Sequence, residues 1–129
     1  MSFHASSEDI RLEDGHILKA RLRDADGNYK DAEIDLNNFI GNDDGRFQWG
    51  GENFSESAED IHFGIEGGAS VPVLRARLRR VDGEFSDADI NLGERVENQD
   101  GEFIFSKQDI TLLLHLGLAL LQAYDTNNI

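Results

Sequence analysis

Apolar and polar residues alternate along two pairs of segments, and this alternation predicts β-strands with one buried face. Residues 18–23 and 74–79 carry Leu or Ala at every second position, with Lys or Arg between them. Residues 31–36 and 87–92 alternate Ala, Ile and Leu with acidic or amide side chains. An Asp-Gly pair separates the two members of each pair, which is typical of a β-hairpin. The body of the chain is therefore predicted to be mostly β.

Shorter elements are predicted after each hairpin. The alternation stops at residues 36–40, where we expect a single helical turn. A further Asp-Gly pair then precedes each of two short predicted strands, at residues 46–49 and 102–105.

The same elements occur twice because the chain contains an internal repeat. With a shift of 56 residues, positions 18–49 align with 74–105 without a gap, and 15 of these 32 positions are identical. The start of each copy aligns at a shift of 51 residues, so the second copy is five residues longer. The extra length falls around residues 64–72, which contain Gly67-Gly68 and are predicted to be a loop. Two copies are too few for a solenoid and each is too small to be stable alone, so we expect two halves sharing one core about a pseudo-twofold axis.

Composition narrows the possible functions. Twelve Lys and Arg residues stand against 26 Asp and Glu residues, for a formal net charge of −14. A chain this acidic is poorly suited to bind nucleic acid or an anionic membrane. The longest apolar run, residues 110–123, is too short to span a bilayer, so no membrane span is predicted.

The absence of cysteine excludes disulfides, thiolate metal sites and thiol catalysis. The first residues carry neither a basic start nor an apolar run, so we predict no signal peptide and a cytoplasmic location. Export by another route stays open at this point.

Sequence patterns of catalysis and of metal or cofactor binding are missing. The four histidines are scattered singly, and no HExxH sequence, Gly-x-Ser-x-Gly elbow, P-loop or dinucleotide fingerprint occurs. Residues 24–27 and 42–45 resemble calcium loops only superficially, because Gly is fourth rather than sixth, so turns are predicted there. We therefore predict a protein that is not an enzyme and holds no cofactor or metal.

The basic side chains of residues 19–23 and 75–79 form two stripes that could suggest a phosphate track. The second strand of each predicted hairpin, however, is acidic on the corresponding face. Opposite charges across neighbouring strands stabilise a hairpin, so we predict a charge ladder instead.

Both copies also carry a shared polar pattern. It comprises Ile34-Asp35-Leu36-Asn37, Ile40, Asn42, Asp44-Gly45, Trp49 and Asn53-Phe54 in the first copy, and Ile90-Asn91-Leu92, Asn98 and Asp100-Gly101 in the second. Repeated at this spacing, with a lone Trp near the end of the first copy, the pattern resembles that of the cyanovirin-N homolog family. The resemblance covers residues 3–105, and the absence of cysteine is similar to the fungal members of that family.

The resemblance implies a mostly β, pseudo-symmetric fold in which two tandem repeats exchange strands, with short helical turns. A domain of residues 1–105 would contain sequence repeats at about 3–53 and 54–105. Its two spatial lobes would be a terminal lobe, residues 1–39 with 95–105, and a middle lobe, residues 40–94.

The resemblance also implies a non-catalytic lectin for mannose-rich glycans with α1-2-linked mannose, bound at one shallow loop site per lobe. The alternative is a protein-interaction or structural module that has the same fold and little sugar binding. The implied middle-lobe site comprises Asn42, Asp44, Asn53, Glu56 and Ser57, with Arg79 and its neighbours on the facing hairpin. The implied terminal-lobe site comprises Ser6, Arg23, Ala25, Asn98 and Asp100.

The two implied sites are unequal. Ala5 occupies the repeat position of Glu56, and Ala25 is also short and apolar. A missing polar partner leaves a sugar hydroxyl desolvated and unpaired, at a cost of roughly 1–3 kcal/mol. We therefore expect the middle lobe to bind sugar more tightly.

The chain departs from the founding member of the family at three places. Ser7, Leu22, Ala58 and Leu78 stand at or near the cysteine positions, and burial of the two leucines is expected to offset part of the lost crosslinking. Gly50-Gly51 replaces a hinge proline, which disfavours domain swapping and favours a monomer. Residues 106–129 lie outside the resemblance and are predicted to form an apolar helix over about 108–124, packed on their own domain or on a second copy.

Overall fold

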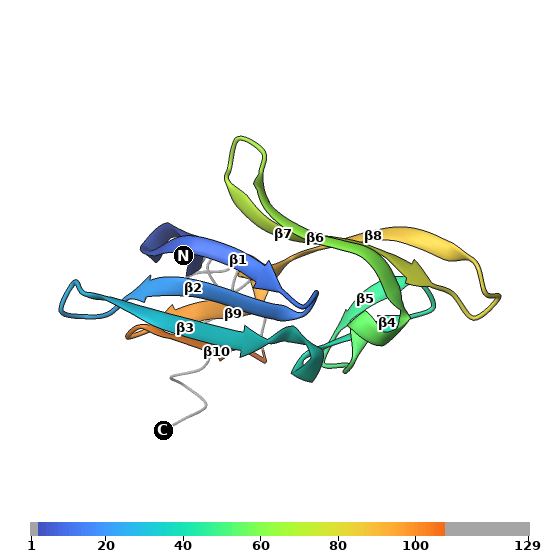
Figure 1. The fold of residues 1–129 in the computed structure, drawn as a ribbon, viewed down its shortest axis with the longest axis horizontal. Coiled ribbons are helices and arrows are strands. Elements are labelled where there is room, and N and C mark those ends of the chain that lie inside the picture. Colours follow the sequence, from blue (N-terminus) through green and yellow to red (C-terminus); the bar gives the residue numbers. More distant parts are fainter. Residues whose placement is uncertain (1–2, 108–129) are drawn as a thin grey trace, which may run out of the picture.

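The computed structural model describes residues 3–107 of the 129-residue chain. Within this part, groups of two or three β-strands are separated by short 3-10 helices; Figure 1 shows the strands. The elements are η1 (Phe3–Ser6), β1 (Ser7–Glu13), β2 (Ile17–Arg23), β3 (Tyr29–Asp35), η2 (Leu36–Asn38), β4 (Ile40–Asp43), β5 (Arg46–Trp49), η3 (Phe54–Ser57), β6 (Ala58–Glu66), β7 (Val71–Arg79), β8 (Phe85–Asn91), η4 (Leu92–Glu94), β9 (Val96–Gln99) and β10 (Glu102–Phe105).

Strands pair only with their neighbours in sequence, and every pairing is antiparallel. Two three-stranded sheets, β1-β2-β3 and β6-β7-β8, are accompanied by two hairpins, β4-β5 and β9-β10. Each hairpin packs on the sheet of the other repeat: β10 contacts β3, and β5 contacts β8. Figure 1 shows β9 and β10 beside β2 and β3, far along the chain from them. The predicted mostly β fold of two repeats with exchanged strands is confirmed.

The predicted hairpin faces are also confirmed. Leu18 and Leu22 on β2 are fully buried, as are Leu74 and Leu78 on β7. The 3-10 turns η1 and η3 add the same element to both repeats, a buried Phe at the first position. Leu18 and Leu74, together with these two Phe residues, belong to one buried cluster drawn from both halves, so one core serves both repeats.

The positions related to the family's cysteines face each other directly. Ser7 pairs with Leu22 across β1 and β2, and Ala58 pairs with Leu78 across β6 and β7. Both leucines have no exposed surface. The two leucines are therefore buried as expected, while their replacement of crosslinks stays what the resemblance implies.

The five-residue insertion does not form the long loop that was predicted around residues 64–72. Strand β6 continues to Glu66 and β7 begins at Val71, so the turn spans only residues 67–70. Gly64 and Pro72, predicted to lie in a loop, belong to these strands. Strands β6 and β7 pair with each other up to Glu66 and Val71, whereas β8 pairs with β7 only from Val73 onward. The β6–β7 hairpin therefore extends beyond the end of β8, and its tip projects from the body in Figure 1.

The basic stripes form charge ladders, with different principal partners from those predicted. Lys19 Nζ lies 2.7 Å from Glu13 on β1 and 3.9 Å from Glu33 on β3. Arg75 approaches Glu66 on β6 at 2.7 Å and Asp89 on β8 at 3.4 Å. Strands β2 and β7 are central in their sheets, so acidic residues flank them on both sides, and the first strand of each sheet provides the closer partner.

Asp24 confirms the turn interpretation of residues 24–27. Its carboxylate accepts hydrogen bonds from the backbone N–H groups of Asp26, at 3.0 Å, and Asn28, at 2.9 Å. These bonds hold the pKa of Asp24 below its usual range, the bond from Asn28 being the largest cause.

The predicted helix at about 108–124 lies outside the described residues. Within residues 3–107, no helix has the length and apolar character needed to cross a membrane.

Candidate functional site

The loop between β4 and β5 is a two-residue turn at the far end of the middle lobe. Asp44 and Gly45 have φ angles of 49° and 88°, the left-handed pair that a type I′ hairpin turn requires. A Cβ atom on Gly45 would lie 2.8 Å from Cγ of Arg80. The turn therefore packs closely against the loop between β7 and β8, and glycine permits that approach.

Asn42 fastens the turn to the facing hairpin. Its amide nitrogen donates to the hydroxyl of Ser57 and to the carbonyl of Arg79, both at 2.8 Å. Its amide oxygen accepts from the N–H of Gly45 at 2.8 Å. Both ends of the Asn42 amide are thus engaged within the protein, so this side chain shapes the loop surface.

Asp44 completes the connection from the other side. Its Oδ1 atom accepts a hydrogen bond from the N–H of Val81 at 2.9 Å, which ties the tip of the turn to the β7–β8 loop. Asp44 is exposed.

The terminal lobe contains the same network at the repeat-related positions. Asn98 donates to the hydroxyl of Ser6 and to the carbonyl of Arg23, both at 2.9 Å, and accepts from the N–H of Gly101 at 2.9 Å. Asp100 accepts from the N–H of Ala25 at 2.8 Å. Part of each sequence-predicted set therefore meets around two equivalent loops: Asn42, Asp44, Ser57 and the Arg79 carbonyl in one lobe, and Asn98, Asp100, Ser6 and the Arg23 carbonyl in the other.

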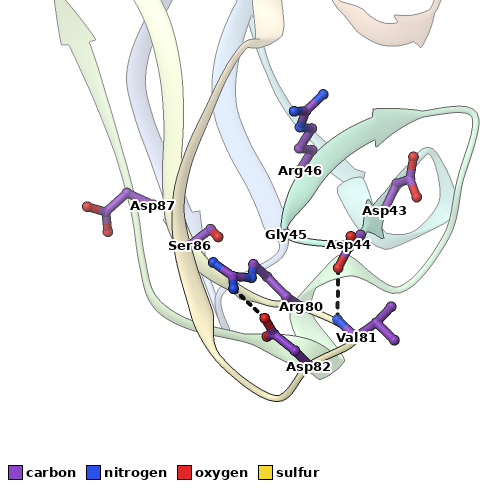
Figure 2. Close-up of a pocket in the computed structure, with 9 residues that line it drawn as sticks. All are labelled: Asp43, Asp44, Gly45, Arg46, Arg80, Val81, Asp82, Ser86 and Asp87. Atoms are coloured by element: carbon purple, nitrogen blue, oxygen red, sulfur yellow. Dashed lines mark hydrogen bonds and ion pairs between the residues drawn. The ribbon is translucent and has the colours of Figure 1, made fainter.

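A shallow hollow of about 840 Å³ lies over the middle-lobe network, between the β4–β5 turn and the β7–β8 loop. Figure 2 shows side chains of both signs around it. The lining residues are Asp43, Asp44, Gly45, Arg46, Arg80, Val81, Asp82, Ser86 and Asp87, and we call this hollow the middle-lobe pocket.

One ion pair and one apolar side chain define the β7–β8 side of the middle-lobe pocket. Arg80 pairs with Asp82, and this contact, followed by the N–H of Glu84, lowers the pKa of the Asp82 carboxyl. Asp82 is accordingly ionised at neutral pH. Val81 is 90% exposed at the rim and offers an apolar surface beside the charged groups.

The predicted middle-lobe residues divide into two groups. Asp44 lines the pocket, whereas Asn42, Ser57 and the carbonyl of Arg79 form the hydrogen-bonded support behind it. The two remaining residues, Asn53 at the N-cap of η3 and Glu56 within η3, are exposed and stand outside the pocket lining. Their proposed role stays a prediction.

Sequence reasoning indicated neighbours of Arg79 on the facing hairpin but did not name the β7–β8 residues that line the pocket. Arg80, Val81 and Asp82 are the repeat equivalents of residues 24–26, in which Ala25 had been placed near the other site. Applying the shift of 56 residues to Ala25 would have indicated Val81 and its neighbours.

The two lobes differ in charge around their shared framework. Arg80 and Arg46 of the middle lobe correspond to Asp24 and Glu102 in the terminal lobe. A Lys side chain partly compensates: Lys30 corresponds to Ser86 and its ammonium lies 3.6 Å from the Asp24 carboxylate. The terminal-lobe loops are therefore more acidic, and the middle-lobe pocket is more evenly charged.

Two strand-exchanged repeats with a polar loop site at each end define a lectin fold of the cyanovirin-N type. The chain belongs to the CVNH domain family, whose model matches residues 3–104.

Fungal proteins are among its similar relatives. A cyanovirin-N homolog of Neurospora crassa is 57% identical over 107 residues, covering 80% of this chain and 96% of that protein. The NMR structure of the Gibberella zeae homolog has a TM-score of 0.75 and 52% identity, covering 80% of this chain and 95% of that one.

Two further similar structures contain a sugar. A complex of microvirin with mannobiose has a TM-score of 0.73 and 28% identity, covering 81% of this chain and 98% of that one. A MoCVNH3 variant in complex with a tetramer of N-GlcNAc has a TM-score of 0.70 and 30% identity, covering 80% and 95%. Family membership and these complexes support a carbohydrate-binding class.

Proposed function

We propose that this protein is a non-catalytic lectin that binds mannose-rich oligosaccharides through α1-2-linked mannose, mainly at the middle-lobe pocket. The observation that carries the proposal is the contact between Asp44 and the N–H of Val81, which joins two loops of opposite repeats into one polar hollow. The resemblance to the family and the mannobiose complex of microvirin support the choice of sugar.

The pocket matches the chemistry of a neutral sugar. Hydroxyl groups both donate and accept hydrogen bonds, and carboxylates accept while guanidinium groups donate. Asp43 and Asp87 would accept from hydroxyls, and Arg46 would donate to them. Val81 would contact the C–H face of a sugar ring. Carboxylates and guanidinium groups in one pocket can make directional hydrogen bonds to the hydroxyls of an uncharged sugar.

An NMR titration with α1-2-mannobiose tests the proposal. We expect amide shifts at Val81 and at residues 43–46 and 80–87, saturating at millimolar sugar or below. A parallel titration with the N-GlcNAc tetramer checks whether the pocket prefers mannose. Absence of loop shifts with either sugar would favour the alternative, an interaction module of the same fold.

A matched pair of variants separates the pocket from the framework. In Asp44→Asn the side-chain oxygen can still accept from Val81 N–H, but the carboxylate charge and one acceptor are lost. We expect binding to weaken about tenfold, equivalent to roughly 1.4 kcal/mol. Asp100→Asn makes the same change at the repeat-related position, and we expect an effect below about twofold. Equal losses in both variants would contradict the assignment of the main site.

We also propose a cytoplasmic location, because a small protein without cysteine needs no oxidising compartment. Fractionation of the source cells, with detection of the native chain, tests this. Recovery from the culture medium alone would contradict it.

A further inference from the structure

An apolar hollow separate from the loop sites lies where the two repeats meet. The rings of Phe39 and Phe105 stack with centroids 4.6 Å apart and planes inclined by 25°. Trp49 extends this cluster, with its ring centroid 5.8 Å from that of Phe105. The hollow has a volume of about 370 Å³, and we call it the aromatic groove; it is lined by Asn38, Phe39, Gly50, Arg95, Phe105 and Lys107.

The chain leaves the last strand of each repeat beside this groove, at Gly50 in the first copy and at Ser106 in the second. The N–H of Gly50 donates to the carbonyl of Phe39 at 2.8 Å, and the N–H of Ser106 donates to the carbonyl of Arg95 at 2.6 Å. These two bonds are related by the shift of 56 residues. After Gly50 the chain enters the second repeat, whereas after Ser106 it continues toward residues 108–129.

Arg95 holds the chain where it leaves β10, at Ser106 and Lys107, beside the groove. One nitrogen of its guanidinium donates to the carbonyl of Lys107 at 2.7 Å, which adds to the bond at Ser106. Its Nε atom is buried and has no acceptor among the described residues. An unpaired buried donor is costly, so an acceptor supplied by residues outside 3–107 would stabilise the fold at this atom.

Residues 108–129 supply a segment of suitable chemistry. The relatives are matched over 95–100% of their own length, yet cover only 80–82% of this chain, so these residues are an addition to the shared domain. The addition contains a run of 14 apolar or weakly polar residues, 110–123, and its second residue is Asp109. From Lys107, the three residues to Ile110 span at most roughly 10 Å, so the run begins within reach of the groove.

We propose that residues 108–124 dock on the aromatic groove of their own chain. The leucines of this segment cover the Phe39–Phe105 stack, and Asp109 accepts a hydrogen bond from Arg95. Attachment at Lys107 gives the segment an effective concentration in the millimolar range or above, which favours its own groove over that of a second copy. The inference does not depend on sugar binding, because the groove and the middle-lobe pocket share no lining residue.

Trp49 is the only tryptophan and reports directly on this groove. We expect its emission to shift to longer wavelength, and acrylamide quenching to increase about twofold or more, in a chain that ends at Lys107. The full-length variant Leu112→Ser with Leu116→Ser should change in the same direction, and Asn127→Ser with Asn128→Ser should not. Unchanged fluorescence in both the shortened chain and the leucine variant would overturn the proposal.

A mixed-label NMR sample identifies the chain that supplies the segment. With equal amounts of ¹³C-labelled and unlabelled protein, we expect NOEs from leucine methyls to the Phe39 and Phe105 rings only within labelled molecules. Intermolecular NOEs, or a sedimentation coefficient that rises with concentration, would assign the segment to a second copy and overturn docking on its own chain.

Asp109→Asn tests the contact to Arg95. We expect a change in the side-chain Nε–H resonance of Arg95 in the full-length protein, with most of the fluorescence of Trp49 retained. As a separate check, the chain ending at Lys107 and the full-length protein should differ by less than about twofold in affinity for mannobiose. An Nε–H resonance that is the same in the full-length protein, the shortened chain and Asp109→Asn would contradict the assigned contact.

Discussion

The side-chain amide of Asn98 donates a hydrogen bond to the hydroxyl of Ser6, 2.9 Å away, and joins the last hairpin to the first turn of the chain. The repeat-related pair, Asn42 and Ser57, makes the same contact at 2.8 Å. In each case the amide comes from a hairpin and the hydroxyl from a 3-10 turn of the other repeat. Strand exchange therefore makes both loop sites composite, and neither repeat contains a whole site.

Asn98→Ala should destabilise the protein. It removes three hydrogen bonds and leaves the N–H of Gly101 without its acceptor, so we expect a loss of about 1–3 kcal/mol in the free energy of unfolding. Urea denaturation followed by circular dichroism measures this. The exposed neighbour Gln99→Ala serves as the control, with an expected change within about 0.5 kcal/mol. An equal effect of both substitutions would show that the amide network contributes little.

Gly51→Ala should also destabilise the protein, for a steric reason. A Cβ atom on Gly51 would lie 2.8 Å from the Cα and 2.9 Å from the N of Gly41, which are backbone atoms that cannot move aside as a flexible side chain can. We expect a loss of roughly 1–3 kcal/mol, as for overpacking of a core. Gly68→Ala is the matched control, because a Cβ there meets nothing within 4 Å. Thermal unfolding of the two variants decides the matter, and a stable Gly51→Ala protein would show that β4 and the hinge can separate cheaply.

The ion pair of Glu66 and Arg75 should make one part of the stability depend on pH. The hydrogen bond from Arg75 holds the pKa of Glu66 below its ordinary value of 4.5. The folded state therefore binds a proton less readily than the unfolded state. The stabilisation is fully present above pH 4.5 and is lost as pH falls through the lowered pKa of the folded state.

Comparison with Glu66→Gln isolates this contribution. Protonation also relieves repulsion in a chain with a net charge of −14, so the wild-type curve alone combines two effects. We expect the stability gap between wild type and Glu66→Gln to be constant from pH 6 to 8, and to close at acid pH. Glu102→Gln serves as a charge-matched control on β10. A gap that widens in acid would reverse the inferred sign.

The sequence predicts the fold better than it predicts individual strands. The alternation at Leu18 and Leu22 is clear because one face of β2 is fully buried. Strand β1 was missed because a bulge between Glu8 and Arg11, with Asp9 at φ 54°, interrupts its alternation. Strand β4 is four residues of mostly polar or glycine character, so no apolar period marks it.

The candidate site was predicted in part for a similar reason. Asn42 and Asp44 were named from the sequence because the repeat and the family resemblance both mark them. Arg80 was covered only as an unnamed neighbour of Arg79, because its repeat equivalent, Asp24, has the opposite charge and residue identity between the copies does not mark it. Its place over Gly45 follows from the packing of two loops that are distant in sequence.

The two loop sites should bind sugar unequally. Both lobes share the framework built on Asn42 and on Asn98, so backbone geometry alone does not separate them. The difference lies in the surrounding side chains. The middle-lobe pocket has two guanidinium donors, Arg46 and Arg80, where the terminal lobe has carboxylates. Lys30 supplies one cationic donor near Asp24. A sugar hydroxyl whose neighbours are the Asp24 and Glu102 carboxylates can only donate to them, so its own oxygen stays unpaired, at roughly 1–3 kcal/mol if it is buried. We therefore expect the middle lobe to bind mannobiose at least about tenfold more tightly.

Charge exchange between the lobes tests this ranking without disturbing the framework. Arg80→Asp gives the middle lobe the residue of the terminal lobe, and Asp24→Arg makes the reverse change. We expect Arg80→Asp to weaken mannobiose binding about tenfold at the middle lobe, with Val81 as the NMR reporter. Asp24→Arg removes a carboxylate that organises its own turn, so amide spectra must first show that residues 24–28 keep their fold. Calorimetry then counts the sites. Tighter binding at the terminal lobe of the unsubstituted protein, read from the amide of Ala25, would refute the ranking, because the more acidic loops would then be the better receptor.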